Sequence, residues 1–153
     1  MKRYPATVLL THDEGLLAHW QRALGTTDQT VIENLEDFFE SSPSGSSVVW
    51  VDLSLARFPV WSADVWQDVL RRDTLRIVAA SSNPNDTEAM LALDAGCAAY
   101  CHAFSDAATL HQIAEVVETG HVWIGKSLMQ RLLRGVNQLV AAPPLQDHSW
   151  RED

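Results

Sequence analysis

Residues 6–14 read ATVLLTHDE, an almost unbroken apolar run that ends abruptly in three polar side chains. A run of this kind, rich in Val and Leu, is typical of a central parallel strand that is covered on both faces. The following residues repeat apolar side chains at helical spacing up to Leu24, and Gly25 stands where a left-handed residue would end a helix. The stretch therefore predicts one strand followed by one helix.

The same alternation of strand and helix patterns continues along the chain. Four further strands are predicted, at residues 30–32, 47–53, 75–80 and 97–102. Helical patterns separate them, the clearest being the apolar stripe of Leu110, Ile113, Ala114 and Val117. Successive strand–helix units predict an α/β fold with a parallel sheet and right-handed crossovers. In such sheets ligands bind beyond the carboxyl ends of the strands.

Helix ends are predicted from the residues between these patterns. Asn83-Pro84 fits a cap followed by proline in the first helical turn, and Ser105 fits the cap of the next helix. Gly96 and Gly120 stand at helix ends. A last amphipathic helix carries apolar positions from Leu128 to Val140.

Composition excludes several classes of protein. The chain has 153 residues, 46 % of them hydrophobic and 20 % charged, as expected of one globular domain. A net charge of −9 would repel phosphate backbones and anionic lipid, which argues against direct nucleic-acid binding. The first apolar run is too short for a secretory signal or a membrane span, so we expect a cytoplasmic protein without membrane contact. Cys97 and Cys101 indicate neither a disulfide framework nor a zinc site and are expected to be buried.

Polar side chains follow four of the predicted strands: His12-Asp13, Asp52, Ser81 and His102-Ala103. Asp13 and Asp52 at one rim form a plausible Mg²⁺ site, because Mg²⁺ prefers few protein carboxylates and keeps several waters. Asp52 beside such a cation can accept a phosphoryl group, which the Ser81 hydroxyl would then contact. Taken singly, each residue is better explained by structure alone, Asp13 and Ser81 as helix caps and Asp52 as the end of a strand, and only their joint placement favours a site. A transition-metal site of His12, Asp13, Asp52 and His102 is a weaker alternative.

Over about residues 1–134 the sequence resembles CheY-like receiver domains of two-component response regulators, especially the NarL/LuxR type. The motifs that carry the resemblance are VLLTHDEGLL, VVWVDLSL, IVAASSNPND and LALDAGCAAYCHAFSDAATLHQIAEVVETGHVWIGKSLMQRLL. The resemblance implies a flavodoxin-like five-stranded parallel sheet of order 2-1-3-4-5, helices on both faces and an extra C-terminal helix. It implies a receiver-like domain at residues 1–122, with the additional helix and an interdomain linker or tail at 123–153. It also makes Asp52 phosphoacceptor-like and assigns switch roles to Ser81 and Tyr100.

Three departures from the receiver pattern indicate a degenerate phosphorylation pocket. Receivers normally carry an acidic pair after the first strand and a Lys after the fifth, where this chain has His12-Asp13 and Ala103. Ala56 also replaces the proline that commonly follows the phosphoacceptor. Loss of the lysine removes a cation that pairs with the phosphoryl group, unless His102 supplies the charge. Weak or lost phospho-acceptance at Asp52 and, at most, weak Mg²⁺ binding are therefore expected.

The resemblance also implies partners. We expect a non-enzymatic regulator of transcription that forms homodimers through its later helices, with a sensor histidine kinase upstream and DNA contacted only through a domain absent from this chain. Some of Trp61, Trp66, Trp123 and Trp150 are expected to face a partner, since exposed aromatic surface often marks association sites, although core packing is the better interpretation of any single one. The alternative is a phosphorylation-independent interaction and dimerisation module. A flavodoxin-like enzyme is disfavoured, because the sequence has no Gly-rich phosphate loop and no G-x-S-x-G nucleophile elbow.

Overall fold

The computed structural model describes residues 6–25, 28–41 and 45–141, with side chains up to residue 134. The chain divides into two compact units, residues 1–123 and residues 124–153. The first unit contains a five-stranded sheet and five helices, and the second contains one helix. The division lies one residue beyond the boundary placed from the sequence.

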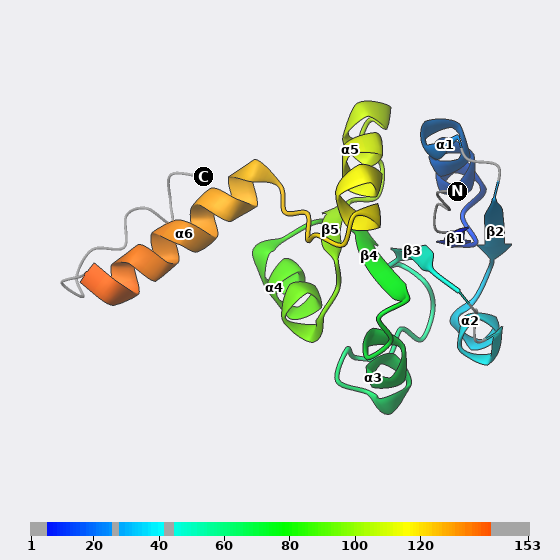
Figure 1. Cartoon of the computed structure of the whole chain (residues 1–153), viewed down its shortest axis with the longest axis horizontal. Helices are drawn as coiled ribbons and strands as arrows, with labels where there is room; N and C mark the ends of the chain where they lie inside the picture. Colours follow the sequence, from blue (N-terminus) through cyan, green and yellow to red (C-terminus); the bar gives the residue numbers. More distant parts are fainter. Residues whose placement is uncertain (1–5, 26–27, 42–44, 142–153) are drawn as a thin grey trace. The chain divides into compact units, whose positions relative to one another are not determined.

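The sheet is fully parallel, and its order is β2-β1-β3-β4-β5, which confirms the predicted order (Figure 1). Its strands are β1 (Ala6–Leu10), β2 (Gln29–Ile32), β3 (Ser47–Asp52), β4 (Leu75–Ser81) and β5 (Ala99–His102). β3, at the centre, is buried along its whole length. A strand that is buried on both faces needs apolar side chains on both. This explains why polar and apolar residues do not alternate along SVVWV.

The strand register brings the polar strand ends to one edge. Asp52 pairs in register with Ala80, and Ser81 pairs with His102. Leu10 is level with Val51, so the chain leaves β1 directly beside the end of β3. The residues that follow β1, β3, β4 and β5 therefore meet at the carboxyl edge of the sheet.

Five helices cover the two faces of this sheet. α1 (Glu14–Leu24) and α5 (Ala107–Glu118) lie on one face (Figure 1). The other face is covered by α2 (Leu35–Ser41), α3 (Asp64–Leu70) and α4 (Asp86–Ala95). The predicted stripe of α5 is buried as expected, with Leu110, Ile113 and Val117 fully enclosed.

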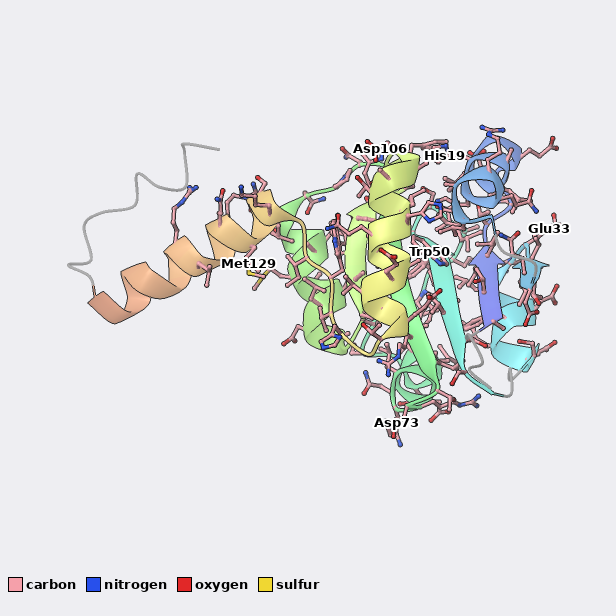
Figure 2. The ribbon with its side chains drawn as sticks, turned by 45° about the horizontal axis from the view of Figure 1, so that its top comes forward. His19, Glu33, Trp50, Asp73, Asp106 and Met129 are labelled. Atoms are coloured by element: carbon pink, nitrogen blue, oxygen red, sulfur yellow. The ribbon has the colours of Figure 1, made fainter. Side chains whose placement is uncertain are left out.

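Trp50, which Figure 2 labels, packs with Trp20 in the core between the sheet and the helices α1 and α5. Their ring centroids are 6.1 Å apart with planes tilted by 52°, a geometry that favours aromatic pairs. Both indoles are almost completely buried. Burial of a large aromatic side chain contributes roughly 1.5–3 kcal/mol, so this pair is a major source of stability for that face.

A second aromatic cluster lies on the opposite face, around α2 and α3. Its members are Phe38, Phe39, Phe58, Trp61 and Trp66. Trp66 is fully buried at its centre, so it packs the core and does not face a partner. Trp61 and Trp123 are half-buried, and Trp150 lies outside the described residues.

The observed helix caps agree in part with those predicted from the sequence. Asp13 caps α1 by accepting a hydrogen bond from the Leu16 backbone, and Gly25 and Gly96 adopt left-handed conformations at helix ends. The prediction of Asn83-Pro84 as a cap is wrong, because the chain first makes a turn in which the Asn83 N–H donates to the Ser81 hydroxyl, and Asn85 is the cap.

Ser105 is not a helix cap either. Its hydroxyl donates to the His102 carbonyl, and Asp106 instead accepts from the Thr109 backbone at the start of α5. At both places a local turn comes between the strand and the helix, so the helix begins later than the pattern predicted and a residue further along caps it.

The second unit contains α6 (Lys126–Ala141), the additional helix predicted from the sequence. The Arg131 guanidinium donates to the Ser127 hydroxyl at 2.7 Å, one turn earlier on the same helix. Within the described part of the chain, neither α6 nor any other helix combines the length and apolar character needed to cross a membrane.

Candidate functional site

Asp52 ends the central strand and is only 3 % exposed. Its Oδ2 accepts a hydrogen bond from the Thr11 hydroxyl at 2.7 Å, and its Oδ1 accepts one from the Ser54 backbone N–H at 2.8 Å. A buried carboxylate is costly unless hydrogen bonds replace its lost hydration. Both oxygens of Asp52 are thus satisfied by the chain itself.

Thr11, which sequence reasoning did not single out, is the residue after β1 that contacts Asp52. It is fully buried directly after the strand, whereas His12 and Asp13 are exposed. The Asp13 carboxylate accepts from the Leu16 N–H at 3.0 Å, while the Asp13 N–H donates to the Thr11 hydroxyl. The only available signal was position: Thr11 immediately follows the buried run, so the sheet edge encloses it before the two exposed residues.

Hydroxyl groups surround the rest of this rim. Ser81, which is 3 % exposed, accepts from the Asn83 N–H at 3.0 Å. The hydroxyls of Ser54 and Ser82 lie 3.2 Å apart. We call the group of Thr11, Asp52, Ser54, Ser81 and Ser82 the Asp52 cup. It brings the predicted Asp52 and Ser81 to the same edge, with one carboxylate among several neutral donors.

Tyr100 lies beside this cup and ties β5 to the start of α4. Its hydroxyl donates to Glu88 Oε1 at 2.6 Å and accepts from the Asn85 N–H at 3.0 Å. Burial, and next the hydrogen bond to Glu88, raise the pKa of Tyr100 to about 12. The phenol is therefore neutral and held in one orientation.

Ala103 occupies a closed position at the end of β5. It is fully buried, its N–H donates to the Ser81 carbonyl at 2.8 Å, and its carbonyl accepts from the Trp20 indole N–H at 2.9 Å. His102 is exposed, and its Nδ1 accepts from the Phe104 N–H at 3.0 Å. The imidazole is thus hydrogen-bonded within its own exposed turn.

The four-residue transition-metal alternative is wrong. His12, Asp13, Asp52 and His102 are all described, yet among the described side chains no group of three or more His, Cys, Asp or Glu has a geometry that holds a metal. The narrower prediction of Mg²⁺ at Asp13 and Asp52 stays a prediction. Its donor set is poor, because Asp13 caps a helix and both Asp52 oxygens accept internal hydrogen bonds.

Cys97 and Cys101 are buried free thiols. Burial raises the pKa of each to about 12. A thiol that stays protonated is a poor nucleophile and a poor metal ligand.

Comparison with known proteins identifies solved structures that have a similar fold. No protein-family model and no curated protein matches the sequence. Among solved structures, the chain is similar to a two-component response regulator of the LuxR family from Aurantimonas sp. SI85-9A1, with 17 % identity and a TM-score of 0.69 over 88 % of this chain and 99 % of that one. It is also similar to the isolated receiver domain of RcsB from Salmonella enterica serovar Typhimurium, with 12 % identity and a TM-score of 0.64 over 84 % and 98 % of the two chains.

A third similar structure is the response regulator DrrB from Thermotoga maritima, with 14 % identity and a TM-score of 0.65 over 78 % of this chain and 55 % of that chain. At these identities the likeness concerns the fold alone. The chain has the CheY-like, flavodoxin-like fold of response regulator receiver domains, with an added C-terminal helix.

Proposed function

We propose that this chain is the regulatory receiver domain of a NarL/LuxR-type transcriptional regulator in which phospho-acceptance at Asp52 is weak or lost. The observation that carries the proposal is the 2.7 Å hydrogen bond from the Thr11 hydroxyl to Asp52. A neutral hydroxyl there satisfies the buried carboxylate without a cation.

Phosphoryl transfer to an aspartate needs positive charge at the developing transition state. The phosphoryl group would leave a donor oxygen and bond to an Asp52 oxygen, adding negative charge to a buried position. A cation entering the cup would meet one carboxylate whose oxygens already accept two hydrogen bonds, and Ala103 offers only a methyl group. Mg²⁺ would supply charge neutralisation when bound, but this donor set would hold it weakly.

The proposed partners follow from the fold. We expect a cytoplasmic homodimer, a sensor histidine kinase upstream, and DNA contact only through a domain not in this chain, because the net charge of −9 disfavours DNA. A solved structure of RcsB, to which this chain is similar, contains two RcsB dimers bound to two parallel DNAs. The additional helix α6, with its apolar positions between Leu128 and Val140, is a candidate for pairing with a second copy.

The test uses a small acyl phosphate with Mg²⁺, followed by intact-mass spectrometry of the chain. We expect little or no added phosphoryl mass on the wild type and none on Asp52→Asn. Thr11→Asp places a second carboxylate at the cup, so Mg²⁺ should raise the melting temperature of this variant more than that of the wild type. Complete modification of the wild type, abolished in Asp52→Asn, would show an active receiver and overturn the proposal.

The second candidate is a phosphorylation-independent interaction and dimerisation module, which the closed position of Ala103 favours. The two functions differ in their response to the phosphoryl donor. Light scattering with and without Mg²⁺ and acyl phosphate measures the oligomeric state. An unchanged dimer supports the module, and a change of mass that depends on Asp52 supports the receiver.

A further inference from the structure

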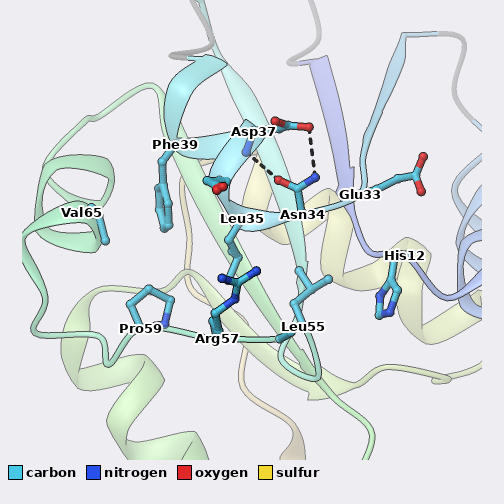
Figure 3. Close-up of a pocket in the computed structure, with 12 residues that line it drawn as sticks. His12, Glu33, Asn34, Leu35, Asp37, Phe39, Leu55, Arg57, Pro59 and Val65 are labelled. Carbon is cyan, nitrogen blue, oxygen red and sulfur yellow. Dashed lines mark hydrogen bonds between the residues drawn. The ribbon is translucent and has the colours of Figure 1, made fainter.

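A pocket of about 570 Å³ lies at the carboxyl edge of the sheet, beside the Asp52 cup but separate from it (Figure 3). One wall is the segment 33–39, which leads from β2 into α2, and the other is the segment 55–65 between β3 and α3. We call it the Arg57 pocket. Its volume falls in the range of roughly 300–1,000 Å³ that small-molecule sites occupy.

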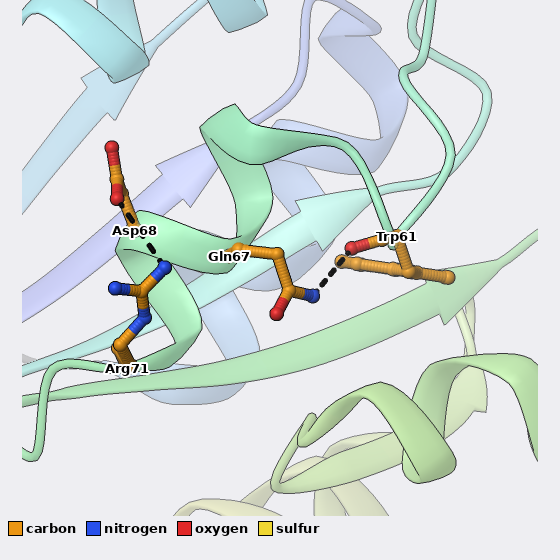
Figure 4. Close-up of polar contacts among 4 residues, drawn as sticks. All are labelled: Trp61, Gln67, Asp68 and Arg71. Atoms are coloured by element: carbon orange, nitrogen blue, oxygen red, sulfur yellow. Dashed lines mark hydrogen bonds and ion pairs between the residues drawn. The ribbon is translucent and has the colours of Figure 1, made fainter.

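The wall formed by residues 55–65 is held in place by the second aromatic cluster. The Trp66 indole N–H donates to the Pro59 carbonyl at 3.2 Å, and the Gln67 amide donates to the Trp61 carbonyl at 3.1 Å (Figure 4). The Trp66 ring also contacts Trp61 and Phe39, at centroid distances of 4.7 Å and 4.9 Å. This long connection is therefore fixed before any ligand arrives, which reduces the entropy cost of binding.

Arg57 is the only arginine or lysine among the residues that line the pocket. Its side chain points into the pocket, toward the segment that carries Leu35 (Figure 3). Within the described part of the chain, its guanidinium has no ion pair, and the apolar side chains of Leu35 and Leu55 beside it are buried. A guanidinium next to apolar surface suits a planar carboxylate that is attached to an apolar body.

Arg57 is also the only non-glycine residue with a positive φ, at 55°, in the described part of the chain. A side chain at such a φ is strained and persists only where its surroundings fix it. The residue with this backbone conformation is thus the same one whose guanidinium lines the cavity.

Carboxylates complete the lining. Asp37 is already engaged, since its Oδ2 accepts from the Asn34 side chain. Glu33 and Glu36 line the pocket as exposed carboxylates with no ion pair in the described part of the chain. An organic anion would be repelled by these two groups and by the net charge of −9, and an organic cation would meet Arg57. A zwitterion satisfies both signs of charge.

We propose that the Arg57 pocket binds a small zwitterion of the amino-acid class with an apolar side chain. The carboxylate pairs with Arg57, the ammonium lies toward the carboxylates of Glu33 and Glu36, and the side chain packs on the apolar lining. This site goes beyond the proposed function, and it needs neither Mg²⁺ nor a phosphoryl group.

The test is a calorimetric and ¹H–¹⁵N NMR titration of the full chain with leucine and with phenylalanine. Two further probes separate the charges: N-acetyl-leucine keeps the carboxylate without the ammonium, and leucinamide keeps the ammonium without the carboxylate. We expect saturable binding of leucine or phenylalanine, at least tenfold weaker binding of both blocked probes, and shifts confined to amides of segments 33–39 and 55–65.

Arg57→Gln should weaken binding at least tenfold, while Arg72→Gln, a matched change at an exposed arginine outside the pocket, should leave it unchanged. Asp52→Asn should bind as the wild type does, which separates failure of this proposal from failure of the proposed function. Absence of saturable binding at millimolar concentrations, full binding by Arg57→Gln, or equal binding of N-acetyl-leucine or leucinamide would each overturn the proposal.

Discussion

The Asp52 cup and the Arg57 pocket lie at the same edge of one sheet, yet they use their polar groups in opposite ways. In the cup, a buried carboxylate is satisfied by Thr11 and by the Ser54 backbone. In the pocket, Arg57 is exposed beside apolar walls and has no ion pair in the described part of the chain. Internal hydrogen bonds satisfy both oxygens of the buried carboxylate in the cup, whereas the guanidinium in the pocket has no such partner among the described side chains.

Truncation of Trp66 should have the largest effect, because this ring is the fully buried centre of the pocket wall. Trp66→Ala leaves a large cavity, and we expect a loss of about 3–5 kcal/mol in the free energy of unfolding, measured by urea denaturation. Trp61→Ala, at the half-buried neighbour, should cost clearly less. Equal costs for the two variants would show that the wall does not depend on a buried centre.

Removal of the Thr11 hydroxyl tests the internal satisfaction of the cup. Thr11→Val keeps the shape of the side chain but leaves Asp52 Oδ2 without its buried donor, so we expect a loss of about 1–3 kcal/mol in unfolding free energy. Thr7→Val, the same change at a buried threonine within β1 and away from Asp52, is the control. Combining Thr11→Val with Asp52→Asn should recover part of the loss, since a neutral amide needs the donor less. Strict additivity of the two changes would contradict the hydrogen bond as the source of stability.

The hydroxyl of Tyr100 predicts a pH dependence. Its pKa of about 12 in the folded chain exceeds the ordinary value of 10.0, so between these values the unfolded chain loses a proton that the folded chain keeps. Stability should therefore fall as pH rises from 10 toward 12. Tyr100→Phe should cost about 1 kcal/mol at pH 7 through its lost hydrogen bonds.

The same variant should lose stability less steeply above pH 10 than the wild type, as measured by urea denaturation at pH 7, 9, 10 and 11. Cys97 and Cys101 add a slope of the same sign in both proteins, because their pKa values are also raised by burial. The difference between the two proteins isolates Tyr100. Parallel pH profiles would show that the phenol is not held neutral.

The smallest effect is expected at Arg57, and it separates binding from stability. Arg57→Gly relieves the positive φ, so unfolding free energy should rise by up to about 1 kcal/mol while amino-acid binding is lost. Thermal unfolding and leucine titration measure the two effects on one sample. A destabilised Arg57→Gly variant would show that the guanidinium supports the fold.

Periodicity in the sequence was sufficient to predict a parallel sheet and the six helices that the structure describes, because buried parallel strands and amphipathic helices leave recognisable patterns. The order of the strands came from the resemblance to receiver domains. It was less informative at the rim. Asp13 was predicted to face Asp52, but its carboxylate caps α1, and Thr11 makes the contact instead. If the end of a strand moves by one or two residues, a different side chain becomes buried at the sheet edge. Local hydrogen bonds determine where the strand ends.

The Arg57 pocket was not predictable from the sequence. Its walls come from two connections that follow different strands, and neither connection has a repeating pattern. The sequence likewise did not decide which of the outer indoles is buried. Core packing was the better interpretation of any single one, and Trp66 follows it, because Phe38, Phe39 and Phe58 enclose its ring.

The indole bond from Trp20 to the Ala103 carbonyl bears on what position 103 can accept. A lysine introduced there would need space where the methyl group is now fully enclosed, and it would have to avoid disturbing a tryptophan in the centre of the core. The packing therefore closes this position to a large side chain, so a cation engineered beside Asp52 would have to be introduced at another position.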